Sequence, residues 1–507
     1  MLSRTANRFP LALLALVGMT ILIPMGRAQK AGAAFTPVIP KTWDDEAVAA
    51  LDVPLADARY SPVQISSDKY YQMTVRPVYK TYPIYAPGKV PADYMEWLKQ
   101  QEPEIVFDAA KLKTEADWIR AGELVFDAPK FFAPLASSDV RDPKYYEETG
   151  VLLAKDGTMP FSRYVIRKKG IVEVGNVSCA SCHTRVMPDG TLVKGAQGNS
   201  PTGPSFAFHS RKQVARSNDQ GKQELASMRF VATLIAGAPW IHPDPVEEFL
   251  TLDDLRAAWE AIPPGVIIRE GTSLRYAPQV PDLIGVKEIR YLDHTGLVRQ
   301  RSIGDLMRYS ALNQDTQLLA RDGDFIPAKG FPVTPSRYSD EQLYALALYV
   351  YALQPPPNPN QFDALAKRGQ KVFQREGCAG CHTPPLYTNN KLTPAEGFTV
   401  PEDHPKKYDI LPISVGTDSS LALRTRRGTG YYKVPSLKGV WYRGPFEHNG
   451  SVATLEDWFD PRRLREDYVP TGYKPYGVKT QAVRGHAFGL ALSAEDRKAL
   501  VAFLKTL

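Results

Sequence analysis

The chain has 507 residues, of which 43% are hydrophobic and 23% are charged. This is the composition of an ordinary globular protein, long enough for about two to four domains. The net charge of +7 is spread along the sequence without a long basic block, which argues against a nucleic-acid-binding surface.

The first predicted element is an export signal at residues 1–28. Arg4 and Arg8 precede an apolar run at residues 11–23, and small residues follow it. This is the order of a signal peptide, with cleavage expected after Ala28. The run is shorter than the roughly 20 residues that cross a bilayer, and an uncleaved anchor is the alternative. The protein is therefore expected in the periplasm or outside the cell, without membrane contact beyond this segment.

Residues 29–108 form a predicted N-terminal extension that is rich in tyrosine and proline. Its tyrosines include Tyr60, Tyr70, Tyr71, Tyr79, Tyr82, Tyr85 and Tyr94. We expect an extended strap whose aromatic side chains anchor it on the rest of the protein. A relay of tyrosine radicals is the alternative interpretation.

All four cysteines lie in two copies of one frame, Cys-x-x-Cys-His. The copies consist of Cys179, Cys182 and His183, and of Cys378, Cys381 and His382. In this frame the two thiols bond the vinyl groups of a haem and the histidine binds the iron. Redox disulfides or zinc sites also use Cys-x-x-Cys, but neither requires the histidine in both copies. The sequence therefore predicts two covalently bound haem c groups, with both histidines as metal ligands.

Similarity between the two halves extends to the segments around each motif. WIRAGELVF at 118–126 resembles LAKRGQKVF at 365–373, and SDEQLYALALYVYAL at 339–353 aligns without a gap with SAEDRKALVAFLKTL at 493–507. The second pair begins with serine caps followed by apolar residues at helical spacing. A helix before the motif and a helix at the end are the parts of a cytochrome c domain. The expected fold is thus mainly α, with two such haem domains in tandem.

The predicted boundaries place the first haem domain at 109–356 and the second at 357–507. The proline-rich segment QPPPNPNQ at 354–361 is a stiff linker between them. A long stretch separates Phe126 from Cys179, whereas Phe373 lies close to Cys378 in the sequence. The first domain is therefore expected to carry long irregular insertions.

The second domain offers no methionine as an axial ligand, because the last methionine of the chain is Met307. A His/His pair or an open site remains, and the missing methionine points to a lower reduction potential. His486, which lies just before the last helix, is the predicted sixth ligand and third metal-binding histidine. His404 and His448 are its alternatives.

The distal side of the first haem has no preferred ligand in the sequence. His242 and His294 are equal candidates. An iron left five-coordinate would be open to dioxygen or peroxide.

The segment VPSLKGVWYRGPFEHNGSVATLEDWFD at 434–460 and the terminal GHAFGLALSAEDRKALVAFLKTL resemble the C-terminal domain of bacterial di-haem cytochrome c peroxidases and the related methylamine-utilisation enzymes. The resemblance implies one haem that transfers electrons and another, in the first domain, that meets the oxidant. It implies catalytic roles for His183 and for a bridging tryptophan, Trp240, with Trp259 as the alternative. A small redox protein would be the electron donor. The family commonly holds a Ca²⁺ ion between the domains, and Pro445 lies where a backbone ligand would be.

Three features depart from the peroxidase pattern. His486 stands near the place of the family's methionine, Asn449 replaces the usual aspartate after His448, and the Phe-Trp-Asp-Gly-Arg stretch of the first domain is absent. The long first domain and the histidine on the second haem are similar to the rubber oxygenases of the same superfamily, whose first haem binds dioxygen in an apolar pocket.

The leading interpretation is an exported di-haem oxidoreductase in which peroxide or dioxygen reacts at the first haem. The alternatives are a rubber-oxygenase-like dioxygenase that cleaves an apolar isoprenoid substrate, and a non-catalytic electron carrier. Arg426, Arg427 and Lys438 are candidates to pair with haem propionates, since a buried charge needs a partner.

Overall fold

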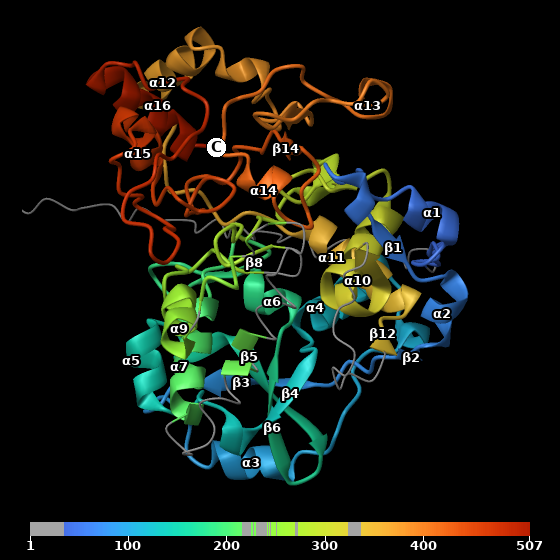
Figure 1. Cartoon of the computed structure of the whole chain (residues 1–507). Helices are drawn as coiled ribbons and strands as arrows, with labels where there is room; N and C mark the ends of the chain where they lie inside the picture. The colour runs from blue at the N-terminus through green and yellow to red at the C-terminus, as the bar shows by residue number, and fades with distance from the viewer. Residues whose placement is uncertain are drawn as a thin grey trace, which may run out of the picture.

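The computed structural model describes residues 35–214, 225–226, 228–229, 241, 243, 245–249, 251–268, 272–322 and 336–507 (Figure 1). The predicted signal peptide at 1–28, Trp240 and His242 lie outside the described residues. Among the residues described, no helix has the length and apolar character needed to cross a membrane. We refer below to residues 35–356 as the first half and to 357–507 as the second half.

The first half is organised around the packing of α4 (Glu115–Asp127) against α11 (Asp340–Ala352). Both helices begin with a capping box, formed by Thr114 with Asp117 and by Ser339 with Gln342, which satisfies backbone N–H groups that have no partner inside the helix. Gly122 lies at the crossing, where an added Cβ would be 2.0 Å from the carbonyl oxygen of Ala345. The two backbones therefore approach as closely as glycine allows.

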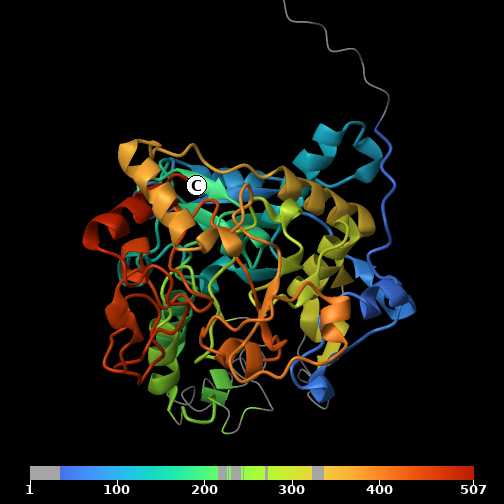
Figure 2. The ribbon, with the colours of Figure 1, turned by 90° about the horizontal axis from the view of Figure 1, so that it is seen from above.

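The second half repeats this arrangement with α12 (Ala364–Arg375) and α16 (Ala494–Lys505). Gly369 lies at the crossing, and its Cβ would be 1.9 Å from the carbonyl oxygen of Ala499. Ala345 and Ala499 occupy the same place in the gap-free sequence alignment. The four helices predicted from the internal repeat are thus confirmed. Figure 1 shows the second pair at the top of the molecule, and the helices remain side by side in Figure 2.

The insertion between Phe126 and Cys179 supplies three strands of an antiparallel sheet, which the sequence did not predict. Its strand order is β3-β5-β6-β4. The strands are β3 (Thr81–Tyr85), β4 (Phe131–Pro134), β5 (Thr158–Lys168) and β6 (Ile171–Asn176). Met159, Tyr164 and Val174 belong to the apolar cluster packed on the sheet. The expectation of a mainly α chain with irregular insertions is therefore corrected to a mixed α and β architecture.

Strand pairing and aromatic packing join the N-terminal extension to the rest of the first half. It contains α1 (Asp45–Ala49), β1 (Pro62–Gln64), α2 (Ser67–Gln72), β2 (Thr74–Val75), β3 and α3 (Tyr94–Gln100). Strand β1 pairs with β11 (Ala320–Asp322), and β2 pairs with β12 (Ser336–Arg337). Trp43 stacks on Tyr70 with ring centroids 4.8 Å apart. The extension is thus anchored by aromatic side chains, as predicted, and it also supplies an edge strand of the main sheet.

Further helices and strands connect these layers. In the first half they are α5 (Pro143–Thr149), α6 (Cys179–Cys182), β7 (Thr184–Val186), β8 (Leu192–Lys194), α7 (Thr202–Val214), α9 (Leu252–Glu260), β9 (Tyr291–Leu292), β10 (Val298–Arg299) and α10 (Ile303–Leu319). In the second half they are β13 (Leu392–Pro394), α13 (His404–Lys407), α14 (Ser420–Leu423), β14 (Tyr431–Lys433) and α15 (Leu455–Trp458).

Candidate haem-binding sites

The second Cys-x-x-Cys-His frame follows α12 directly, in a single 3-10 turn at Cys378–Gly380. The Nδ1 atom of His382 lies 3.1 Å from the carbonyl oxygen of Pro435 and 3.2 Å from that of Tyr387. Because a carbonyl only accepts hydrogen bonds, Nδ1 carries the hydrogen and donates it. Nε2 is then the unprotonated nitrogen, the form in which imidazole binds a metal.

His486 is brought opposite His382 by the loop that precedes α16. The centroids of the two rings are 6.5 Å apart. An imidazole nitrogen binds a metal at about 2 Å, so two axial rings on one iron have centroids roughly 6 Å apart. The Nδ1 atom of His486 is buried and has no hydrogen-bond partner in the described part of the chain. The pair of rings therefore fits the two faces of a haem.

Electrostatics keep both rings neutral, which is the state that metal binding requires. Burial, together with the smaller effect of His486, lowers the pKa of His382 to about 4. Burial also lowers the pKa of His486, against the opposing effect of the Glu447 carboxylate. Neither ring has to lose a proton near neutral pH before it can bind iron.

Arg463 fixes the loop that carries His486. It is fully buried, and its guanidinium donates to the carbonyl oxygens of Trp458, Val483 and His486 at 2.8 to 2.9 Å. The Trp458 ring lies 5.6 Å from the His486 ring. The distal histidine is thus held by one buried cation, which the sequence analysis did not single out.

The two alternative histidines of the second half make other contacts. The Nδ1 atom of His404 lies 2.8 Å from the hydroxyl of Tyr431. The His448 ring packs on Tyr432, with 4.6 Å between ring centroids, and its Nδ1 lies 3.6 Å from the Glu447 carboxylate. His486 is the candidate among the three that the structure places beside His382.

The first Cys-x-x-Cys-His frame begins with α6, which Ser178 caps by accepting from the N–H of Ser181. The Nδ1 atom of His183 lies 3.0 Å from the carbonyl oxygen of Pro281. It therefore donates, as in the second frame, and leaves Nε2 as the metal-binding nitrogen. Gly198 crosses close behind the frame, where a Cβ would lie 1.9 Å from the carbonyl oxygen of Cys182. The chain thus presents His183 in the same way as His382.

The other candidates for the first site are placed elsewhere or lie outside the described residues. His294 donates from Nε2 to the carbonyl oxygen of Gln279 at 2.7 Å, and its backbone oxygen accepts from the N–H of Lys433 in the second half. Trp259 is buried in an apolar cluster, stacked on Phe206 with ring centroids 4.5 Å apart.

One predicted propionate partner already has a carboxylate partner in the protein. Arg427 donates to Asp293 at 2.6 Å and to the side-chain oxygen of Asn313 at 3.0 Å. Burial opposes ionisation of Asp293, but Arg427 outweighs it and holds the pKa of that carboxyl below its usual value. Arg426 is buried, whereas Lys438 is exposed.

The residues around Pro445 do not fit a Ca²⁺ ion. The carbonyl oxygen of Pro445 accepts from the side-chain amides of Gln197 at 2.9 Å and Gln279 at 2.8 Å. A carbonyl has two lone pairs, so neither is left for a cation. In the described residues, no group of three His, Cys, Asp or Glu side chains is arranged to hold a metal ion. The two amides occupy the place expected for calcium.

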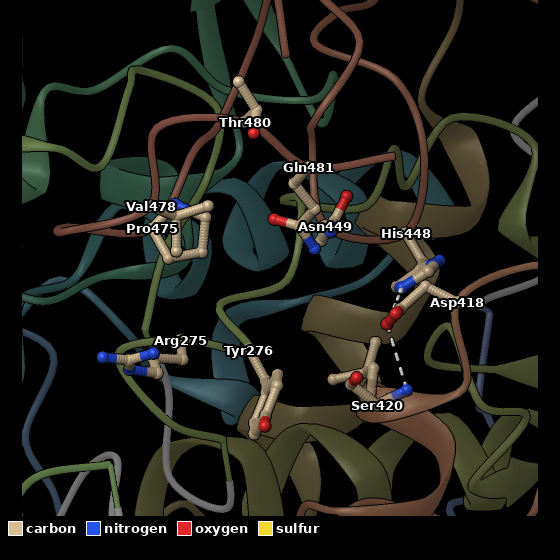
Figure 3. Close-up of a pocket in the computed structure, with 11 residues that line it drawn as sticks. Arg275, Tyr276, Asp418, Ser420, His448, Asn449, Pro475, Val478, Thr480 and Gln481 are labelled. Carbon is tan, nitrogen blue, oxygen red and sulfur yellow. Dashed lines mark hydrogen bonds and ion pairs between the residues drawn. The ribbon is translucent and has the colours of Figure 1, made fainter. Parts of the chain in front are cut away.

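A polar cavity of about 250 Å³ lies where the halves meet, and the sequence analysis missed it. It is lined by Arg275 and Tyr276 of the first half and by Asp418, His448, Asn449 and Gln481 of the second. Figure 3 shows His448 next to Asp418 on one side of the cavity and Arg275 on the other. The Nε2 atom of His448 lies 3.9 Å from the Asp418 carboxylate. His448 thus lies between the carboxylates of Asp418 and Glu447. The only sequence signal was the His-Asn-Gly triplet.

Comparisons with known proteins find similarity to cytochromes c and cytochrome-c peroxidases. Residues 430–469 match the family model described as RoxA-like, cytochrome c-like. The chain is 28% identical over 166 residues to the cytochrome-c peroxidase IdrP1 of Denitromonas iodatirespirans, covering 28% of this chain and 40% of the relative. It is 26% identical over 166 residues to IdrP1 of Pseudomonas sp. (strain SCT), covering 29% and 41%. The matches thus span about two fifths of these relatives.

Among solved structures, hydrazine synthase of Kuenenia stuttgartiensis aligns with a TM-score of 0.28 and 17% identity, over 59% of this chain and 92% of that chain. A MauG-like protein associated with microbial copper homeostasis aligns with a TM-score of 0.22 and 18% identity, over 35% and 62%. Over the matched stretches the chain is thus similar to RoxA-like cytochromes c and to cytochrome-c peroxidases.

Proposed function

We propose that the protein is an exported di-haem c-type oxidoreductase, periplasmic or secreted, in which peroxide or dioxygen reacts at the first haem. Cys179, Cys182 and His183 hold that haem, and Cys378, Cys381, His382 and His486 hold the second. Haem iron, when bound, supplies the redox centre for the oxidant. A small redox protein delivers electrons through the second site.

The observation that carries this proposal is the difference between the two sites. His382 faces His486 at a separation suited to both sides of one iron, which leaves no position for an oxidant there. In the first half, the Nε2 atom of the candidate His294 is hydrogen-bonded to the carbonyl oxygen of Gln279, and His242 lies outside the described residues. The protein therefore directs electrons through the saturated site and admits the oxidant at the other.

Backbone carbonyl groups orient the metal-binding histidine of each frame. The carbonyl of Pro281 orients the His183 ring, and the carbonyls of Pro435 and Tyr387 orient the His382 ring. A hydrogen bond at Nδ1 fixes the tautomer and makes Nε2 a stronger ligand. Arg463 keeps the His486 loop closed over the second site.

A rubber-oxygenase-like dioxygenase is the second candidate, because the matching family model is the RoxA-like one. In this version dioxygen binds at the same first haem, and an apolar isoprenoid substrate is cleaved there. The residues that hold both haems are the same in the two candidates.

The test begins with intact mass, which should exceed that of the processed chain by two haems. His183→Ala should abolish turnover, whereas His486→Ala should slow reduction and leave residual reaction at the first haem. Peroxide consumption with a reduced cytochrome donor indicates the peroxidase, and oxygen uptake on an isoprenoid polymer indicates the oxygenase. If carbon monoxide binds neither reduced haem and both assays are silent, the protein is a non-catalytic electron carrier and the proposal is wrong.

A further inference from the structure

The histidines of the two haem frames are hydrogen-bonded to two chain segments that touch each other. His183 donates to the carbonyl oxygen of Pro281, and His382 donates to that of Pro435. The first segment continues from Pro281 to Asp282. The second continues from Pro435 to Tyr442 and Arg443. These residues form a direct connection between the two segments.

Tyr442 makes the shortest contact between them. Its hydroxyl donates to Oδ2 of Asp282 at 2.7 Å, while Oδ1 of Asp282 accepts from the N–H of Ile284 at 2.9 Å. Tyr442 and the Asp282 side chain are 4% and 5% exposed. The contact is therefore shielded from water and fixed in geometry by a hydrogen bond at each carboxylate oxygen.

Arg443 closes the connection on the side of the second frame. Its Nη2 atom donates to the carbonyl oxygen of Ser436 at 2.7 Å, and Ser436 is bonded to Pro435. Its Nε atom lies 3.8 Å from Oδ2 of Asp282. The Arg443 side chain, which is 16% exposed, thus reaches from Ser436, beside the acceptor of His382, to Asp282, beside the acceptor of His183.

Opposite charges stabilise the Asp282 carboxylate in the protein interior. Burial raises the pKa of the Asp282 carboxyl, and Arg443 opposes that rise, as does the more distant Arg185. Arg185 also donates to the carbonyl oxygen of Gly444 at 3.1 Å. Removing one member leaves a buried charge without its partner, which is strongly destabilising.

We propose that Tyr442 and Arg443 form the electron-transfer bridge between the two haems. The route runs from His382 through Pro435, Ser436, Arg443, Tyr442, Asp282 and Pro281 to His183. One electron leaves the iron on His382, which changes from ferrous to ferric, and arrives at the iron on His183, which changes from ferric to ferrous. No bond forms or breaks. Each non-covalent step is a hydrogen bond, which couples donor and acceptor better than a gap of the same length.

This inference rests on the proposed function, since it assumes a haem at each frame. The experiment reduces the oxidised holoprotein with less than one equivalent of reductant in a stopped-flow instrument. Redistribution of the electron between the two haems is followed by absorbance, and both reduction potentials are measured by titration. Tyr442→Phe removes one hydroxyl without changing any charge, so transfer should slow several-fold while both potentials stay as in the wild type.

Tyr291→Phe is the matched control. Tyr291 is also buried, and its hydroxyl also donates to an aspartate of the other half, Asp409, at 3.0 Å, but it lies off the route. Its electron transfer should equal that of the wild type. Circular dichroism and the haem absorption bands verify that both variants fold.

Asp282→Asn and Asp282→Ala separate the contribution of the hydrogen-bonded route from that of the charge, and circular dichroism shows whether each variant folds. The amide of Asp282→Asn still hydrogen-bonds with Tyr442, so potentials should shift while transfer at equal driving force remains fast. Asp282→Ala loses both. Wild-type transfer in Tyr442→Phe and Asp282→Ala overturns the bridge and leaves the proposed function intact. Absence of any transfer between haems in the wild type overturns the proposed function itself.

Discussion

At the scale of single residues, a few buried polar groups position the candidate ligands. Arg463 holds the His486 loop through three backbone carbonyls and has no exposed surface. The sequence predicted His486 because the second half has no methionine. It did not predict Arg463, because in the run Pro-Arg-Arg-Leu nothing distinguishes the buried arginine from its exposed neighbour.

Arg463→Met should loosen the distal ligand without removing it. Three carbonyls lose their donor, and each buried group left unpaired costs about 1 to 3 kcal/mol. We expect a lower melting temperature and a partly high-spin second haem, measured by electron paramagnetic resonance. His486→Ala should give the fully high-spin form. The control is Arg462→Met, because Arg462 is exposed and pairs only with Asp460; a low-spin spectrum in both arginine variants would contradict the role of Arg463.

His294 should make stability depend on pH. Burial lowers its pKa to about 4 from the ordinary 6.5, against the opposing charge of Asp293. Between these values the unfolded chain binds a proton that the folded chain does not, so stability falls as pH decreases from 6.5 to 4. His294→Gln keeps a donor to Gln279 but does not titrate. Its melting temperature should therefore fall less than that of the wild type across this window, and equal slopes would refute the assignment.

At the scale of elements, the two helix pairs have the same crossing. Gly122 meets Ala345 and Tyr349, and Gly369 meets Ala499 and Phe503 at the matching positions. The repeat in the sequence was enough to predict these helices, because capping residues and apolar spacing are local signals. The sheet was missed because β3 lies far from β5 in the chain, and β5 has long buried runs in place of a strict alternation.

Gly122→Ala and Gly369→Ala should each destabilise the protein. The new Cβ meets backbone atoms, which cannot rotate away, so the helices must separate; overpacking of this kind typically costs about 1 to 3 kcal/mol. Leu124→Ala is the control, since Leu124 lies on the same helix α4 with an exposed side chain, away from the crossing. Thermal unfolding of the three holoprotein variants measures the effect, and equal melting temperatures would show that the crossings can relax.

At the scale of the whole molecule, the halves are joined by direct hydrogen bonds at the place expected for calcium. Gln197 and Gln279 of the first half both donate to Pro445 of the second, and Gln197 also accepts from the N–H of Gly444 at 3.0 Å. No sequence pattern predicted this arrangement, because two glutamines far apart in the chain form no local motif. The haem frames, in contrast, were readable because both thiols and the histidine are adjacent.

A chelator should therefore leave the junction unchanged. We expect the same melting temperature and haem spectra with and without EDTA. Gln279→Ala should lower the melting temperature, since one buried hydrogen bond contributes about 1 kcal/mol. A decrease in the melting temperature of the wild type with EDTA, restored by added Ca²⁺, would show that an ion is bound after all.

The pairing of β1 with β11 and of β2 with β12 sets the order in which the chain can fold. As the polypeptide emerges N-terminus first, strands β1 and β2 of the extension have no strand partners until residues 320–337 appear, and pairings so distant in sequence form slowly. Cys179 and Cys182 emerge well before that point. These pairings of the first half thus close only after the first frame has emerged. In the second half the frame likewise precedes α16, the helix that packs on α12.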